Sequence, residues 1–214
     1  MIPTIAEIFE QGDNLELAYQ NEQLNLLLNQ NPNEKWVKTH PFIKNYKYLP
    51  IDKVEFLLKK IFKQYKIEIL REGTAFNGVY VVTRVHYLNP VTGLFDFHDG
   101  IGACQLQTAK GTSASDLINI NNGAISMAFP IAKTIAVKDA CDHFGRLFGA
   151  DLNRNDLIPF QIDNNIVDRV SNRVVKLIES KKTIDDLEQL LVENPTIDKN
   201  LIEEKIKKIK ENEI

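Results

Sequence analysis

The sequence has 214 residues, of which 43% are hydrophobic and 26% charged, and its formal net charge is −3. This composition is ordinary for a globular protein. Its two cysteines, Cys104 and Cys141, are too few for a disulfide framework, and their spacing fits no zinc site. We expect an intracellular protein with no membrane partner, because no apolar run is long enough to span a bilayer and MIPTIAEIFE lacks the basic flank of a signal peptide.

The charge is unevenly distributed along the chain. Residues 1–33 contain five acidic residues and no basic ones, whereas residues 34–74 contain ten basic residues and five acidic ones. Local charge sets the affinity for a polyanion more than the total charge does. An acidic arm therefore precedes a basic block, which either binds nucleic acid or forms solvated helix faces.

The first helices are predicted from leucine and lysine patterns. Residues 15–29 are rich in leucine and are followed by the helix-breaking NQNPN, so they predict a short helix. Residues 34–50 are irregular and rich in lysines and aromatic residues. Residues 51–65 predict an amphipathic helix, with Asp52 as a plausible N-cap and Lys53 in the first turn.

Three strands are expected next. Residues 66–73 alternate between apolar and charged side chains, and residues 78–88 and 94–106 flank the turn NPVTG, which predicts a hairpin. If Leu88 faces Leu94, one face of the hairpin is polar and the other apolar. The polar face would then hold Arg84, His86, Asp96 and His98, and the apolar face Val85, Tyr87, Phe95 and Phe97.

A long helix is predicted after a Gly/Ser/Asn-rich loop at 107–123, which has Lys110 near its start. Small residues recur in it every four positions, which allows close approach to a sheet or to another helix. They are Ala132, Ala136 and Ala140, and Cys141, Gly145 and Gly149, while Phe144 and Phe148 supply bulk for the core.

The predicted fold is therefore α+β, with an antiparallel β-meander packed on a long helix. Three polar-faced helical patterns follow at 164–180, 183–193 and 199–212. We divide the chain into an acidic N-terminal helical arm (1–33), a principal domain (34–158) and a helical C-terminal tail (159–214).

The sequence contains neither a phosphate-binding ATPase loop nor a nucleophile elbow. Asp96, His98 and Asp99 could hold a divalent cation in a nuclease, or could simply be polar residues of a sheet face and turn. Lys138, Asp142 and Arg146 are spaced at i, i+4 and i+8, which favours an intrahelical salt-bridge ladder in the absence of other information.

Two motifs carry a resemblance to a known family. The hairpin GVYVVTRVHYLNPVTGLFDFHDGIGACQL has an alternating apolar strand, a turn and a second strand that ends in a G-x-G segment. The helix AKTIAVKDACDHFGRLFG combines alanines, a basic residue, an aspartate and a closing F-G-x-x-F-G. With the upstream DKVEFLLKKIF, these stretches resemble the DNA-annealing domain of single-strand annealing proteins of the Rad fifty-two superfamily, in its phage Sak-like branch.

The resemblance implies ATP-independent binding and annealing of single-stranded DNA in recombination and repair by a homo-oligomeric ring or filament. It implies a non-enzymatic protein that uses no cofactor or metal, is encoded by a phage or prophage and acts in the bacterial cytoplasm. Its partners would be single-stranded DNA, annealed duplex and, by analogy, the host single-strand-binding protein through the C-terminal tail.

The same resemblance assigns DNA-contacting residues. Lys138 matches the groove lysine of the long helix, Lys53 the basic residue that opens the preceding helix, and Lys110 a basic loop residue. Where the family often has a second basic residue, this chain has Asp139, so Lys133 or Arg146 would supply the charge. Strand pattern and charge add Arg71 and Arg84 as DNA-binding candidates.

Two other functions stay open from the sequence. One is a metal-dependent DNA-processing nuclease that uses Asp96, His98 and Asp99. The other is a non-enzymatic adaptor that binds a partner protein through its helical tail, with the basic block merely solvated.

Overall fold

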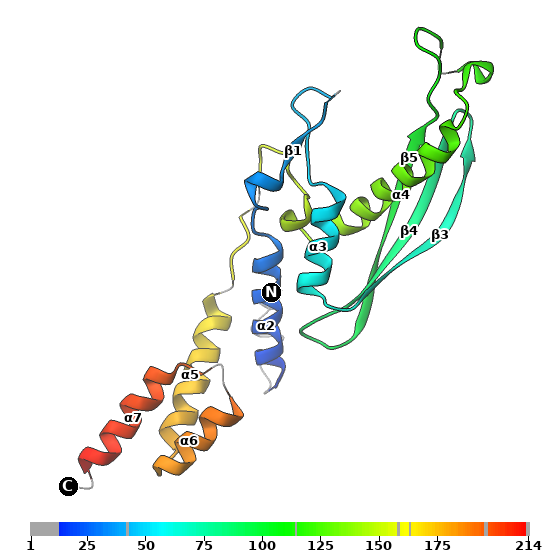
Figure 1. Ribbon diagram of the computed structural model, residues 1–214. Helices are drawn as coiled ribbons and strands as arrows, with labels where there is room; N and C mark the ends of the chain where they lie inside the picture. The colour runs from blue at the N-terminus through cyan, green and yellow to red at the C-terminus, as the bar shows by residue number, and fades with distance from the viewer. Residues whose placement is uncertain are drawn as a thin grey trace, which may run out of the picture. The chain divides into compact units, whose positions relative to one another are not determined.

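The computed structural model describes residues 13–212, apart from residues 42, 114, 158, 163, 195 and 196. Residues 1–12 of the predicted acidic arm lie outside the described residues. The described residues divide into two compact units, one within residues 24–160 and the other within residues 13–23 and 161–212. The fold is α+β, which confirms the predicted class (Figure 1).

The larger unit consists of a three-stranded antiparallel sheet with helices on one side. The sheet contains β3 (Tyr65–Ala75), β4 (Gly78–Leu88) and β5 (Phe95–Gln105), with β4 in the centre. α4 (Ala124–Asp142) packs along one face of this sheet, and α3 (Ile51–Ile61) packs beside α4 (Figure 1). The short elements of this unit are η1 (Glu34–Trp36), β1 (Lys38–Thr39), β2 (Lys47–Tyr48), η2 (Leu117–Asn119) and η3 (Arg146–Phe148).

The contact between α4 and the sheet depends on small residues on both sides. Ala132, Ala136 and Ala140 are fully buried along one stripe of α4. A Cβ atom on Gly102 of β5 would overlap the Ala132 carbonyl oxygen and the Ala136 backbone nitrogen, and Gly100 is restricted in the same way by Ala136 and Ala140. The G-x-G segment and the alanine repeat therefore allow the helix backbone to lie directly on the strand.

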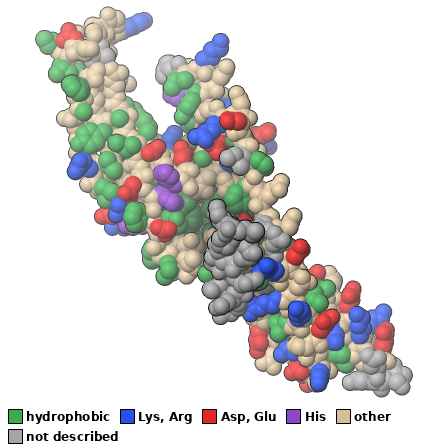
Figure 2. Space-filling model, turned by 180° about the vertical axis from the view of Figure 1, so that it is seen from behind, with side chains coloured by type: hydrophobic (Ala, Val, Ile, Leu, Met, Phe, Trp, Pro, Cys, Tyr) green, Lys and Arg blue, Asp and Glu red, His purple; other side chains and the backbone are tan. Residues whose placement is uncertain are grey.

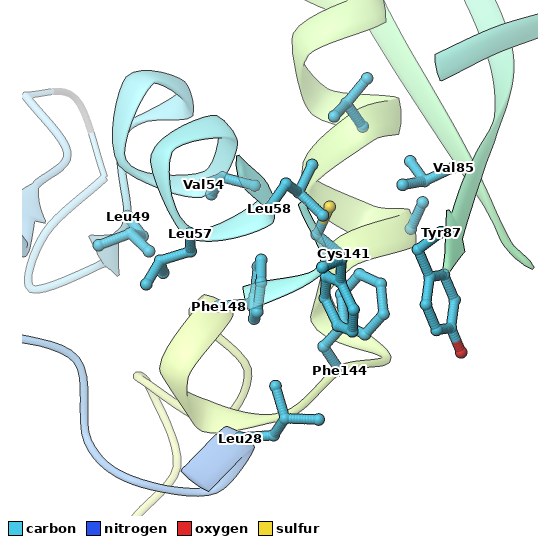
Figure 3. Packing of buried hydrophobic residues seen from close by; sticks show 13 residues of the cluster. Leu28, Leu49, Val54, Leu57, Leu58, Val85, Tyr87, Cys141, Phe144 and Phe148 are labelled. Carbon is cyan, nitrogen blue, oxygen red and sulfur yellow. The ribbon is translucent and has the colours of Figure 1, made fainter. Parts of the chain in front are cut away.

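A hydrophobic cluster joins α3 to the C-terminal half of α4 (Figure 3). Val54, Leu57 and Leu58 project from α3 toward Cys141 and Phe148. The aromatic rings of the wider cluster stack closely; the Phe62 and Phe144 ring centroids, for example, are 4.5 Å apart. Burial of these side chains is the main force that holds α3 on α4.

The smaller unit is helical. It contains α5 (Asn164–Ser180), α6 (Ile184–Glu193) and α7 (Lys199–Asn212), so the three helices predicted for the C-terminal tail are confirmed nearly to the residue. Their shared core is Ile178, Leu187, Leu190 and Ile202. The first part of α2 (Asp13–Leu28) adds a contact between Leu15 and Ile166. Among the helices of the described residues, none has an apolar stretch long enough to cross a lipid bilayer.

The predicted register of the hairpin between β4 and β5 is wrong by one residue. Leu88 pairs with Phe95 rather than with Leu94, because the loop closes on a hydrogen bond from the Asn89 N–H to the Leu94 carbonyl (2.9 Å). A shift of one residue moves every side chain of a strand to the other face. The face away from α4 therefore carries Arg84, His86, Phe95, Phe97 and Asp99, and the face toward α4 carries Val85, Tyr87, Asp96 and His98.

Two predictions about helix ends are also wrong. α3 begins at Ile51 with Pro50 at its N-cap, so Asp52 lies in the first turn and does not cap the helix. α4 ends at Asp142, and the backbone at Gly145 has φ of 118°, which a residue with a side chain rarely adopts. Arg146 therefore lies in η3 and is not one helical turn beyond Asp142.

Candidate nucleic-acid-binding groove

The basic, aromatic-rich segment 38–48 forms a short hairpin, made by β1 and β2. Lys38 pairs with Tyr48 and Thr39 with Lys47. Asn153 fixes this hairpin from outside, since its side chain accepts a hydrogen bond from the Lys47 N–H (2.7 Å) and donates one to the Lys47 carbonyl (2.9 Å). Asn153, which is remote in sequence, thus positions both Lys47 and the neighbouring Tyr48.

A groove of about 750 Å³ lies between this hairpin and α4. One wall presents aromatic rings and a lysine from the hairpin, and the other presents aliphatic side chains, Lys138 and two aspartates from α4. The lining residues are His40, Pro41, Ile43, Tyr46, Lys47, Tyr48, Leu49, Pro130, Ile131, Thr134, Ile135, Lys138, Asp139, Asp142, Phe148, Gly149 and Asn153.

Lys138 is the predicted site residue that lines this groove. Its ammonium nitrogen lies 4.9 Å from the centroid of the Tyr48 ring, within the range of a cation–π contact. Burial lowers the pKa of Lys138, and the nearby Asp142 carboxylate opposes that shift. Lys138 is thus a partly desolvated cation held beside an aromatic ring, an arrangement that strengthens its attraction for an anion.

Asp139 has a structural role. Its Oδ2 accepts a hydrogen bond from the backbone N–H of Ile101 (2.9 Å), on the outer edge of β5. This bond joins α4 to a strand whose outer edge pairs with no other strand among the described residues. Asp139 therefore ties the helix to the sheet.

Asp142 lines the same groove with an altered acidity. The pKa of Asp142 is raised to about 6, chiefly by partial burial and also by the neighbouring Asp139 carboxylate, while Lys138 and His143 oppose the shift. A carboxyl group that titrates near neutral pH changes the net charge of the groove between pH 5 and 7.

The remaining lysine candidates and Arg146 lie outside the groove lining. Lys53, in the first turn of α3, forms an ion pair with Asp52 (2.9 Å). Lys133 is exposed on α4, and Lys110 is exposed in the loop before α4. Arg146 is half-buried in η3.

The other two arginine candidates, Arg71 and Arg84, lie on the face of the sheet away from α4. Arg84 forms two hydrogen bonds with Asp99, both 2.7 Å, and lies 3.8 Å from the Phe97 ring centroid. Arg71 is exposed on β3 and pairs with Val82, which has the same orientation as Arg84. Because the groove lies on α4, the sheet and α4 separate Arg71 and Arg84 from it. Figure 2 views the molecule from behind and shows hydrophobic side chains intermixed with charged and histidine side chains.

The residues of the nuclease alternative do not converge. Asp96 and His98 lie on the face toward α4, where both contact the Tyr87 hydroxyl, at 3.3 and 3.2 Å. Asp99 lies on the opposite face and is engaged by Arg84. Within the described part of the chain, no group of three or more His, Cys, Asp or Glu side chains is arranged to hold a metal ion.

The groove lining includes three residues that were not predicted from the sequence, Lys47, Tyr46 and Tyr48. The enrichment of the segment in lysine and aromatic residues was visible, but the segment has no helix or strand periodicity that would orient these side chains. The signal was therefore compositional, and only the tether to Asn153 shows which side chains reach α4.

Comparisons with known proteins assign no family to the chain. It matches neither the models of known protein families nor any curated protein at a significant level. The resemblance to annealing proteins therefore rests on the motifs in residues 52–62 and 78–149, and the ligand of the groove has to be inferred from its residues.

Proposed function

We propose that this protein binds single-stranded DNA in the groove between the β1–β2 hairpin and α4, and anneals complementary strands without a nucleotide cofactor. The observation that carries the proposal is Lys138, a half-buried cation held 4.9 Å from the Tyr48 ring in a groove that Lys47 also lines. The resemblance of the hairpin and helix motifs to annealing proteins supports the same function.

The groove has the chemistry that sequence-independent binding of a single strand requires. Cations neutralise phosphates, and aromatic or apolar side chains contact bases or sugars of any sequence. Lys47 and Lys138 would take the first role, and Tyr46 with Ile131 and Ile135 the second. The surrounding segment favours an anion, because residues 34–63 contain eight lysines and three acidic residues.

Annealing itself makes modest chemical demands. Two complementary strands pair spontaneously once their mutual repulsion is reduced and their bases remain accessible, so no nucleophile or metal is needed. The residues proposed to contact DNA are cations and aromatic side chains that hold a strand, and the annealed duplex is the product.

A single groove offers few cations, so repetition in a homo-oligomer is part of the proposal. A ring or filament repeats Lys138 in every subunit and turns weak sites into a continuous basic track. Two features support self-association: β3 and β5 are the edge strands of the described sheet, and β5 carries the exposed side chains of Phe95 and Ile101.

The helices of the smaller unit are suited to bind a partner other than DNA. They share a core of their own, so they can present a surface without altering the groove. We propose that this unit recruits a protein partner, by analogy the host single-strand-binding protein, and that the protein acts in the cytoplasm of a bacterial host.

The proposal is tested by annealing two complementary oligonucleotides that carry a fluorophore and a quencher, in the absence of ATP. We expect the protein to accelerate pairing at low salt and without Mg²⁺, and to leave the strands intact. No acceleration, together with no salt-sensitive DNA binding, would refute the proposal. Mn²⁺-dependent shortening of the strands would instead support a nuclease.

A further inference from the structure

A second group of aromatic and cationic side chains lies on the larger unit, outside the groove lining. The rings of Trp36 and Phe56 meet edge to face, with centroids 5.6 Å apart and planes at 83°. The Lys53 ammonium nitrogen lies 5.8 Å from the Trp36 ring centroid. Lys53 and Phe56 are at positions i and i+3 of α3, so they are neighbours on one helix surface.

These side chains remain open to solvent. Phe56 keeps 50% of its surface exposed, and the Lys53 side chain keeps 36%. Trp36 is half-buried and rests against the hydrophobic cluster of α3 and α4. Two adjacent rings, one of them anchored in the core, thus form a rigid apolar surface, which binds a flat ligand with little loss of side-chain freedom.

The charge around the rings identifies the class of ligand. Lys35 is exposed next to Trp36, and Lys59 and Lys60 are exposed in the last turn of α3. Within residues 34–63 the lysines outnumber the acidic residues by eight to three. Flat rings flanked by cations fit a nucleobase and its adjoining phosphates, because every base has a face that stacks on an aromatic ring.

We propose that a base of the bound single strand stacks on the exposed ring of Phe56 and contacts Trp36 beside it, while Lys53 and Lys35 pair with the flanking phosphates. The two rings, whose planes are at 83°, together form the platform. This inference rests on the proposed function and adds a second point of contact outside the groove. Stacking of this kind tolerates any base, so the platform holds the strand without selecting its sequence.

The chain offers a direct probe of the platform, since Trp36 is its only tryptophan. Single-stranded DNA that stacks on the platform should quench or shift the fluorescence of Trp36. Oligothymidine avoids self-pairing, and its binding can be followed in parallel by the anisotropy of a terminal dye. We expect both signals to saturate at the same DNA concentration, in the full-length protein.

A pair of variants distinguishes loss of the platform from the nonspecific effect of losing an exposed aromatic ring. Phe56→Leu keeps an apolar side chain but removes the ring, and should weaken oligothymidine binding about fivefold, the lower end of the stacking contribution of one base. Phe76→Leu makes the same change at a phenylalanine that is 97% exposed in the turn between β3 and β4, and should leave affinity unchanged.

The outcomes distinguish this inference from the proposed function. DNA binding that leaves the Trp36 fluorescence unchanged, with wild-type affinity for Phe56→Leu, would overturn the platform while the groove stands. A change in oligomer size for Phe56→Leu, at unchanged DNA affinity per subunit, would identify an interface between copies and also overturn it. A complete absence of DNA binding would refute both proposals.

Discussion

The substitution Gly102→Ala tests the packing that positions Lys138. A Cβ atom at this position would overlap two backbone atoms of α4, the Ala132 carbonyl oxygen and the Ala136 nitrogen, which no side-chain rotation can relieve. Carbon and oxygen atoms pack at roughly 3.5 Å, so α4 would have to withdraw from β5 by about 1 Å. That movement loosens the packing of the alanine stripe on Val79 and Val81.

The expected cost follows from two opposing effects. Overpacking a core costs about 1–3 kcal/mol, whereas replacing glycine by alanine lowers the entropy of the unfolded chain and recovers about 0.4–1 kcal/mol. From the middle of each range, a net loss of about 1.3 kcal/mol in a chain of this size lowers the melting temperature by roughly 3–5 °C. Thermal unfolding followed by circular dichroism measures this change.

A control on the same strand makes the result specific. Ala103→Val adds two carbon atoms on the exposed face of β5 and should change the free energy of unfolding by less than about 0.5 kcal/mol. If Gly102→Ala melted within a degree of the wild type, the close approach of α4 to β5 would be refuted.

Three further predictions concern the core and the groove. Thr83 has a buried hydroxyl with no hydrogen-bond partner among the described residues, so Thr83→Val should stabilise the protein by about 1 kcal/mol. A melting temperature lower than that of the wild type would contradict this expectation. Asp142 has a pKa raised to about 6, and a bound phosphate would raise this pKa further. DNA affinity should therefore increase as the pH falls from 8 to 6. In anisotropy titrations, Asp142→Asn should bind DNA more tightly than the wild type at pH 8 and show a flatter pH profile. An unchanged pH profile for that variant would argue against a role for Asp142. Asn153→Ala removes both hydrogen bonds to Lys47, so hydrogen exchange in residues 38–48 should accelerate and DNA binding should weaken several-fold. Unchanged exchange would refute the role of Asn153 in holding this hairpin.

Elements with strong periodicity could be predicted from the sequence. The helices of the C-terminal tail were placed nearly to the residue because their apolar positions follow the helical repeat without interruption. The alanine repeat of α4 correctly indicated that the helix packs closely on another element, which is the sheet rather than a second helix.

Features that depend on the pairing of distant residues could not be predicted. The register of β4 and β5 turned on one residue of the loop, whose closing bond joins Asn89 to Leu94, and the error exchanged the two faces. The groove was missed because segment 38–48 is oriented by Asn153, more than a hundred residues away in the chain. Lys138 was found through its motif, whereas Tyr48, which it contacts, has no comparable signal.

The central claim, that the groove binds single-stranded DNA through Lys138, is tested most directly by the salt dependence of binding. Lys138→Met keeps the apolar stem and removes the charge, and Lys207→Ala removes a lysine whose side chain is 79% exposed on α7 in the other unit. We expect Lys138→Met to weaken oligothymidine binding and to reduce the slope of log K against log salt by about 0.7 for each phosphate that the variant no longer neutralises, while Lys207→Ala should match the wild type. Wild-type affinity and slope for Lys138→Met would contradict the central claim.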